Sequence, residues 1–331
     1  MFFYDAERSG RKKGKGRVRI TNKNRKGTSG QGLLRRIYKN RAYYLLLLPF
    51  MIFLFVFKYK PMYGIILAFK DFKIREGIMG SPWAGLKYFR QLFEAASFWE
   101  VLSNTLIISL MNLAFSWPVP IALAIFINEI GNRRVKKVFQ TASYLPHFIS
   151  WVIAASLITD VLALNGPINA LLGVLNRGPV YFLADSNVFR GVLVLTNIWK
   201  GAGWSAIIYI AAITAIDPNL YEAARVDGAK KRQEIWHITL PGIRSTILTL
   251  FILEIGKLLS SNFDQIFNLY SPAVYDVADV LDTYTYRQGL ESFNFSYATA
   301  AGFFQNGIGF VLVIISNIVV KNLSSGEESL W

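Results

Sequence analysis

The chain has 331 residues, of which 53% are hydrophobic, 15% aromatic and only 17% charged. This composition favours a membrane protein over an ordinary soluble domain. No cysteine is present, which excludes disulfide frameworks, thiolate nucleophiles and cysteine-ligated metals. The two histidines, His147 and His237, lie far apart in the sequence. We interpret both as packing or hydrogen-bonding residues rather than metal ligands.

The formal net charge of +15 is concentrated near the N-terminus. Fourteen of the 36 Lys and Arg residues precede residue 42, in a segment with few apolar residues and no helical periodicity. We therefore predict that residues 1–41 form a basic cytoplasmic tail, largely disordered, which anchors the topology against anionic lipid. We favour this interpretation over nucleic-acid binding.

Six segments have the length and apolar character of membrane helices, which need about 20 mostly apolar residues to cross roughly 30 Å of hydrocarbon. The third segment is the least regular, because Pro146 and His147 interrupt its first half. The predicted spans are residues 42–60, 101–127, 138–159, 191–216, 243–263 and 297–320.

The distribution of Lys and Arg predicts which side each connection faces. With the basic tail inside, 24 Lys and Arg lie on the cytoplasmic side and ten on the outer side, which favours cytoplasmic N and C termini. We predict an all-α membrane protein with one six-helix transmembrane domain over residues 42–323 and a short cytoplasmic tail over 324–331.

The polar loop of residues 217–241, between the fourth and fifth spans, carries clear helix signals. Asp217 is placed to cap a first turn and Pro218 fits the position that needs no N–H donor, so we expect a short helix from Pro218 to Val226. Gly228 then supplies a tight turn. We expect a second short helix over residues 230–238, with Pro241 beginning the next membrane helix. From physics alone, this hairpin could also merely link two spans.

The residues of the loop form a specific pattern that a simple linker would not require. Its pattern resembles the EAA loop of permease subunits in binding-protein-dependent ABC importers: Glu222-Ala223-Ala224, then Asp227-Gly228-Ala229, then Ile238-x-Leu240-Pro241. The stretches "GLKYFRQLF", "LNGPINALLG" and "KNL" also resemble the sugar-importer branch. Within that branch the chain resembles the first of two permease subunits of the maltose type, and importers of oligosaccharides that include uronate-rich ones such as alginate fragments.

This resemblance implies the six-helix architecture of type I ABC importer permeases in the bacterial cytoplasmic (inner) membrane. The loop would be a coupling helix that docks on a cytoplasmic ATPase subunit, with Glu222 meeting a basic group there. The implied partners are a second permease subunit, two ATPase subunits, an extracytoplasmic sugar-binding protein and an oligosaccharide. ATP and Mg²⁺ would be bound by the ATPase subunits, and this chain would hold no cofactor, metal or catalytic residue.

Polar groups at membrane depth mark candidate pathways, because they are expensive unless they face a cavity or a partner. In the fourth span Asn197, Lys200, Gly201 and Trp204 recur at three- and four-residue intervals, which predicts one face. An amide and an indole suit a sugar, since they offer hydrogen bonds and a flat apolar surface.

A similar stripe in the fifth span contains Glu254, Lys257 and Ser261. Glu254 and Lys257 have two open interpretations, an i,i+3 ion pair or a role in the pathway. In the family that the loop resembles, the spans flanking it line the translocation path, which favours the pathway. Four other polar residues are expected to make interhelical hydrogen bonds: Asn104, Asn112, Gln305 and Asn306.

Two other functions, those of a secondary transporter and of an intramembrane enzyme, would require different sequence features. A secondary transporter or channel driven by an ion gradient would be expected to show inverted repeats or broken helices with acidic relays, and only Glu254 is a candidate. An intramembrane enzyme would need a nucleophile with its base or two paired carboxylates, and the spans contain neither arrangement. The sequence therefore favours a non-catalytic importer subunit.

Overall fold

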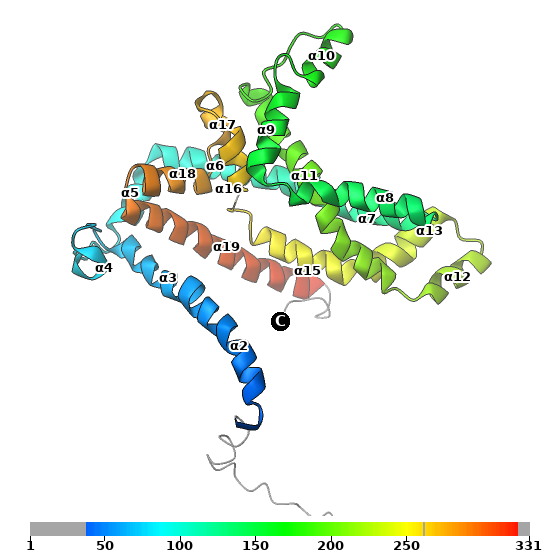
Figure 1. Cartoon of the computed structure of the whole chain (residues 1–331), viewed down its shortest axis with the longest axis horizontal. Helices are drawn as coiled ribbons and strands as arrows, with labels where there is room; N and C mark the ends of the chain where they lie inside the picture. Colours follow the sequence, from blue (N-terminus) through cyan, green and yellow to red (C-terminus); the bar gives the residue numbers. More distant parts are fainter. Residues whose placement is uncertain (1–37, 261, 324–331) are drawn as a thin grey trace, which may run out of the picture. The chain divides into compact units, whose positions relative to one another are not determined.

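The computed structural model describes residues 38–260 and 262–323. The described residues are almost entirely helical, and their one β feature is an isolated bridge between Lys70 and Trp83 (Figure 1). Contacts divide the chain into two units, Met1–Pro61 and Met62–Trp331. Most of the predicted basic tail (1–41) and the whole of the predicted tail 324–331 lie outside the described residues.

The first unit contains the predicted first span. Helix α2 (Arg41–Leu54) continues through the π-helical turn η1 (Phe55–Tyr59) into α3 (Lys60–Met62), where the first unit ends. Pro49 lies inside α2, and none of the residues of α2 is buried by the chain itself. An apolar helix of this length with no buried residue is suited to face lipid or another subunit.

The second unit contains the other helices. Its first half comprises η2 (Tyr63–Phe69), α4 (Gly77–Gly80), α5 (Lys87–Glu94), α6 (Ala96–Met111), the π-helix η3 (Asn112–Ser116), α7 (Pro118–Glu129), α8 (Arg133–Tyr144), η4 (Leu145–Phe148), α9 (Trp151–Leu162) and α10 (Pro167–Val174). The second predicted span is confirmed, because α6, η3 and α7 form one apolar stretch from Ala96 to Glu129.

The second half begins with α11 and ends with α19, each of 29 residues. It comprises α11 (Ser186–Thr214), α12 (Pro218–Val226), α13 (Lys231–Glu234), the π-helix η5 (Ile235–Thr239), α14 (Leu240–Gly242), α15 (Arg244–Ile255), α16 (Phe263–Leu269), η6 (Pro272–Val274), α17 (Tyr275–Ala278), α18 (Leu281–Tyr286), η7 (Arg287–Glu291) and α19 (Phe295–Leu323). Helix α12 is bent from α11 by 69°, and α15 from the helical segment before it by 60°.

The predicted third span, residues 138–159, is wrong, because the helix breaks in its middle. Helix α8 ends at Tyr144, a 3₁₀ turn contains Pro146, and α9 starts after Ser150, whose hydroxyl accepts the N–H of Ile153 at 3.3 Å. Proline lacks the N–H donor of a regular helix, and a serine cap begins a new one. The apolar stretch that has spanning length is instead Trp151–Val174.

The predicted fifth span, 243–263, also ends early. Helix α15 stops at Ile255, and α16 starts at Phe263. Four helices among the described residues are long and apolar enough to cross a membrane, and the number is six if each of the two bent pairs forms one span. The fourth and sixth predicted spans are confirmed by α11 and α19.

Three apolar clusters hold the second unit together. One joins α5, α6, α18 and α19 around Leu92, Phe98 and Leu281. Another joins α6, α9, α11 and α16 around Phe189 and Ile266. The last joins α7, α11 and α15. Helix α11 contributes to two of these clusters, and it carries several of the predicted pathway residues.

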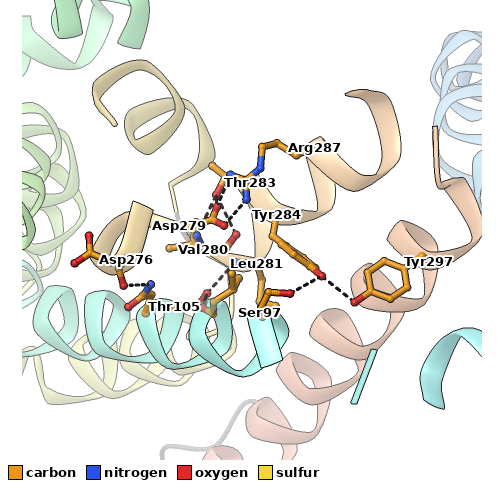
Figure 2. Close-up of polar contacts among 12 residues, drawn as sticks. Ser97, Thr105, Asp276, Asp279, Val280, Leu281, Thr283, Tyr284, Arg287 and Tyr297 are labelled. Atoms are coloured by element: carbon orange, nitrogen blue, oxygen red, sulfur yellow. Dashed lines mark hydrogen bonds and ion pairs between the residues drawn. The ribbon is translucent and has the colours of Figure 1, made fainter. Parts of the chain in front are cut away.

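The connection between α15 and α19 is fixed by buried polar contacts (Figure 2). Asp279 is 6% exposed and accepts both Thr283 Oγ1 and the guanidinium of Arg287. The hydroxyl of Thr105 in α6 accepts the N–H of Leu281 at 2.9 Å. Buried polar groups that find all their partners fix one arrangement, so α17 and α18 are tied to α6.

Helices α8 and α11 approach closely at Gly203. A Cβ at Gly203 would lie 2.0 Å from the carbonyl oxygen of Ser143, whereas one at Gly191, in the same helix, would meet nothing within 4 Å. We therefore expect Gly203→Ala to push α8 away from α11 at a cost of about 1–3 kcal/mol. Gly191→Ala should be neutral or slightly stabilising, because alanine favours helix. Thermal unfolding of the purified variants checks this, and equal melting temperatures would contradict the contact.

Candidate functional site

The first helix of the 217–241 loop forms as predicted. Helix α12 runs from Pro218 to Val226, and the Asp217 carboxylate accepts the N–H of Asn219 at 2.9 Å. Pro218 occupies the first turn, where no N–H donor is required. The sequence signals for this helix are local, which is why they predict its start correctly.

The predicted turn at Gly228 is also confirmed. Gly228 has φ +79°, a left-handed conformation that residues with a side chain rarely adopt. The helix closes beside it, with the N–H of Ala229 donating to the carbonyl oxygen of Ala224 at 2.9 Å. A Cβ at Gly228 would meet nothing within 4 Å. Within this chain, glycine is therefore required at position 228 for its backbone angle and not for lack of space.

The second half of the loop differs from the prediction. The expected helix over residues 230–238 is a single turn of α13, followed by the π-helix Ile235–Thr239. Pro241 does not begin the next membrane helix but lies in α14, and α15 starts at Arg244 after the bend. Proline clashes with a preceding helical carbonyl and donates no N–H, and the wider π-helical turn before it is the local adjustment.

A buried carboxylate holds the two halves of the loop together. The Glu234 side chain is 3% exposed and accepts Arg225 Nε at 2.9 Å and Lys231 Nζ at 3.0 Å. The hydrogen bond from Arg225 holds the pKa of the Glu234 carboxyl below its ordinary value. Because the pKa is lower in the folded state, this stabilisation is present at neutral pH and is lost as the pH falls through the lowered pKa.

One face of α12 is open. Glu222 and Ala223 are exposed, Ala224 is partly exposed, and Val226 has 88% of its surface exposed. Asp227, at the C-terminal end of the helix, is exposed as well. The residues of the Glu-Ala-Ala motif are thus available to another protein.

A polar cavity lies between α11, α15 and the junction of α6 with α7. It has a volume of about 340 Å³, and four of the residues that line it are Asn112, Asn197, Glu254 and Lys257. The same four residues also line an adjoining cavity of about 350 Å³. Gly201 lines the first cavity. The structure therefore brings together Asn197, Gly201, Glu254 and Lys257 from the two predicted stripes.

Two residues of the predicted α11 stripe point elsewhere. Lys200 is 8% exposed and donates to the carbonyl oxygen of His147 at 3.0 Å, with its ammonium group 5.3 Å from the Trp151 ring centre. Trp204 stacks on the His147 ring, with their centres 4.5 Å apart. Neither residue lines the two cavities. Residues spaced by three and four positions cover a wide arc of the helix surface. One part of this arc on α11 faces the cavity, and the other part contacts His147.

The structure shows the ion pair of Glu254 and Lys257, and their role in a pathway stays a prediction. The two side chains form an i,i+3 ion pair of 3.4 Å, and both line the cavity with side-chain exposures of 46% and 66%. A pair so exposed contributes little to stability. Ser261 lies outside the described residues, while its neighbours Ser260 and Asn262 line the second cavity.

Several residues of the cavity were not predicted from the sequence. Ser116, Trp117, Ser205 and Tyr209 line the first cavity. Ser116 and Trp117 precede Pro118, at the end of the π-helix η3. A proline in the middle of a span is a signal of irregular helix, and it could have directed attention to these residues.

The interhelical hydrogen bonds are as predicted for three of the four residues. Asn104 accepts a bond from Arg190 at 2.7 Å, and Asn112 accepts one from Asn197 at 3.0 Å. Gln305 donates to Asp282 Oδ1 of α18 at 2.8 Å. The prediction for Asn306 is wrong, because its amide donates to Gly302 in its own helix. Asn306 is exposed, so no neighbouring helix is close enough to compete.

The histidines have the packing and hydrogen-bonding contacts expected of them. His147 stacks on Trp204, and His237 Nδ1 lies 3.0 Å from the carbonyl oxygen of Gln233. In the described residues, no group of three or more His, Cys, Asp or Glu side chains is placed to hold a metal ion.

Apolar helices of spanning length, together with a cavity that contains polar side chains, are features of a membrane transport protein. A family of known proteins has these features: residues 116–326 match the model of the "binding-protein-dependent transport system inner membrane component". This match covers more than half of the chain. The chain belongs to this family and is an inner-membrane permease subunit.

Two curated relatives come from Bacillus subtilis (strain 168). The chain is 44% identical over 300 residues to the polygalacturonan/rhamnogalacturonan transport system permease protein YteP, covering 90% of this chain and 93% of YteP. It is 38% identical over 307 residues to protein LplB, covering 92% of this chain and 96% of LplB.

Solved structures show the same likeness. One is the crystal structure of a bacterial ABC transporter involved in the import of the acidic polysaccharide alginate. It matches with a TM-score of 0.81 and 40% identity, covering 88% of this chain and 98% of that chain. The alginate transporter in complex with its pentasaccharide-bound periplasmic protein matches with a TM-score of 0.82 and 39% identity, covering 90% of this chain and 99% of that chain.

Proposed function

We propose that the chain is the first of two permease subunits in an ATP-driven importer of oligosaccharides, including acidic ones. The observation that carries this proposal is the pairing of an exposed Glu-Ala-Ala helix with a polar cavity on the two helices that flank its loop. Relatives that transport polygalacturonan, rhamnogalacturonan and alginate support the substrate class. A soluble protein delivers the oligosaccharide on the outer side, and both termini of this chain lie in the cytoplasm.

The 217–241 loop is the coupling element in this proposal. Glu222, Ala223 and Ala224 form the surface that meets a cytoplasmic ATPase subunit, because they lie on the open face of α12. The turn at Asp227, Gly228 and Ala229 sets the angle of that surface. Leu240 and Pro241 lie at the bend through which the loop continues into α15. ATP and Mg²⁺ are bound by two ATPase subunits, and this chain does no chemistry on them.

The cavity is one half of the translocation pathway. Asn197 and Ser205 offer hydrogen-bonding groups to sugar hydroxyls, and Lys257 offers a positive charge to a carboxylate. Trp204 is 44% exposed, so its ring stays accessible even while it stacks on His147, although it lines neither cavity. The second permease subunit completes the wall, and Lys200, Trp204 and Ser261 then remain candidates for the pathway.

Reconstitution tests this function directly. The chain is placed in liposomes with its second permease, its ATPase subunits and its binding protein, and uptake of a labelled uronate oligosaccharide is measured. Uptake should require both ATP and the binding protein. Uptake driven by an ion gradient, without either of them, would show that the chain is a secondary transporter instead.

Gly228 tests the role of the loop. Gly228→Val should lower ATP-coupled uptake, because a β-branched residue at this left-handed angle costs about 1–2 kcal/mol and tilts the docking surface. Gly228→Asn is the matched control, since asparagine tolerates this angle. If the backbone angle is the requirement, the Asn variant retains most of the uptake. Normal ATP-coupled uptake in the Val variant would contradict the assigned role.

Lys257 tests the preference for acidic sugars. An exposed charge contact contributes up to about 1 kcal/mol, so Lys257→Gln should raise the KM for a uronate oligosaccharide roughly fivefold. The KM for a neutral oligosaccharide of equal length should not change. Glu254→Gln removes the negative member of the pair and should act in the opposite direction on the acidic sugar. A similar loss for both sugars in the Lys257 variant would rule out charge recognition.

A further inference from the structure

Four charged side chains form a continuous chain of contacts at the base of the 217–241 loop. Arg225 and Lys231 both contact the buried carboxylate of Glu234, at 2.9 and 3.0 Å. The same Lys231 Nζ lies 3.0 Å from Glu129 Oε2. We refer to Arg225, Glu234, Lys231 and Glu129 as the loop relay. All four also line a cavity of about 350 Å³ beside Tyr221 and Glu222.

The relay joins elements that are far apart in the sequence. Arg225 lies in the last turn of α12, and Lys231 is the first residue of α13. Glu129 is the last residue of α7. In Figure 1, α12 and α13 lie beyond this end of the helix formed by α6 and α7. The loop is thus linked to α7 as well as to α11 and α15, which it connects along the chain.

Burial makes Glu234 the fixed point of the relay. Its side chain is 3% exposed, whereas those of Arg225 and Lys231 are 55% and 59% exposed. A buried carboxylate needs its partners, because an unpaired buried charge is strongly unfavourable. Both cations must therefore follow Glu234 when the loop moves. A second contact reinforces the hairpin, since the hydroxyl groups of Tyr221 and Thr239 lie 3.0 Å apart.

The other end of α7 is part of the pathway. Trp117 immediately precedes α7, Pro120 is in its first turn, and both line the polar cavity together with Asn112 and Ser116 of η3. Between its two ends α7 packs against α11 through Ile121 and Ala124. A displacement of Glu129 along the axis of α7 therefore acts on the cavity wall through one rigid helix.

We propose that the loop relay makes Glu129 and Lys231 positioning residues for transport: they carry movement of the coupling helix α12 into α7 and so into the cavity wall. This inference rests on the proposed function and deepens it. The direct connections to α11 and α15 move one side of the cavity. The relay adds a second link, from α12 to the α7 part of the cavity wall, and without the relay ATP hydrolysis continues while the cavity changes shape incompletely.

The test uses the complete reconstituted transporter and measures the number of ATP molecules hydrolysed per oligosaccharide taken up. Glu129→Gln keeps the size of the side chain but removes the charge that Lys231 contacts. We expect this variant, and Lys231→Met, to raise the ATP cost per oligosaccharide several-fold. Lys231→Arg preserves the charge and should restore a ratio close to that of the wild type.

The matched control is Arg232→Gln. Arg232 is exposed in the same turn of helix as Lys231 and makes no ion pair with any residue that the structure describes. This variant should keep the wild-type ratio, which shows that loss of a positive charge in α13 is not sufficient. The double variant Glu129→Gln/Lys231→Met should be no worse than the more affected single variant, because the two residues act through one contact.

Two outcomes overturn the relay. One is a wild-type ratio in Glu129→Gln and Lys231→Met. The other is loss of the ATPase subunits from these variants on purification, because the contact would then only support the docking surface. The melting temperature of each variant identifies misfolding, and a misfolded Lys231→Met leaves the isosteric Glu129→Gln to decide. If the wild-type transporter itself shows no ATP-coupled uptake, the proposed function fails, and this is seen before any variant is compared.

Discussion

The second unit depends on how the backbone groups between α15 and α16 find hydrogen-bond partners. A regular helix would satisfy these groups itself, even in lipid. Helix α15 stops at Ile255, and α16 begins only at Phe263. Unpaired backbone groups in the hydrocarbon cost several kcal/mol, so irregular backbone is tolerated only inside protein or beside a water-filled cavity. Gln305 of α19 donates to the carbonyl oxygen of Leu259, and Gln265 of α16 donates to that of Leu193 in α11. The Gln305 amide thus satisfies one backbone carbonyl inside the break, and Gln265 ties the helix after the break to α11. Lys257 and Asn262 line the cavity beside the break.

Local signals in the sequence were sufficient for the first half of the loop. Asp217, Pro218 and Gly228 act on backbone groups only a few residues away, so their effect does not depend on the rest of the fold. The second half depends on distant partners. The π-helical turn ends at Thr239, which contacts Tyr221, and Glu234 is buried by contacts with α12. The Glu-Ala-Ala helix was therefore predictable, and the shape of the segment after it was not.

Hydrophobic length and polar spacing gave most of the span assignments and part of the cavity. Length alone does not place the break between α8 and α9, although Pro146 already marks this segment as the least regular of the six. The spacing of polar residues in the sequence identifies the polar side of α11, but it does not identify which other elements that side contacts. Packing divides it, because Asn197 meets Asn112 of η3 while Lys200 meets the carbonyl oxygen of His147.

The ion pair of the cavity and the ion pairs of the loop differ in how much water reaches them. Glu254 and Lys257 are exposed in the cavity, so water weakens their attraction and either side chain can turn toward a sugar at little cost. Glu234 is shielded from water, so its bonds to Arg225 and Lys231 resist separation and keep the loop in one shape. A pathway needs contacts that exchange easily, and a mechanical link needs contacts that do not. In the mechanism that we propose, the burial of each carboxylate therefore separates the groups that bind the sugar from the groups that transmit movement.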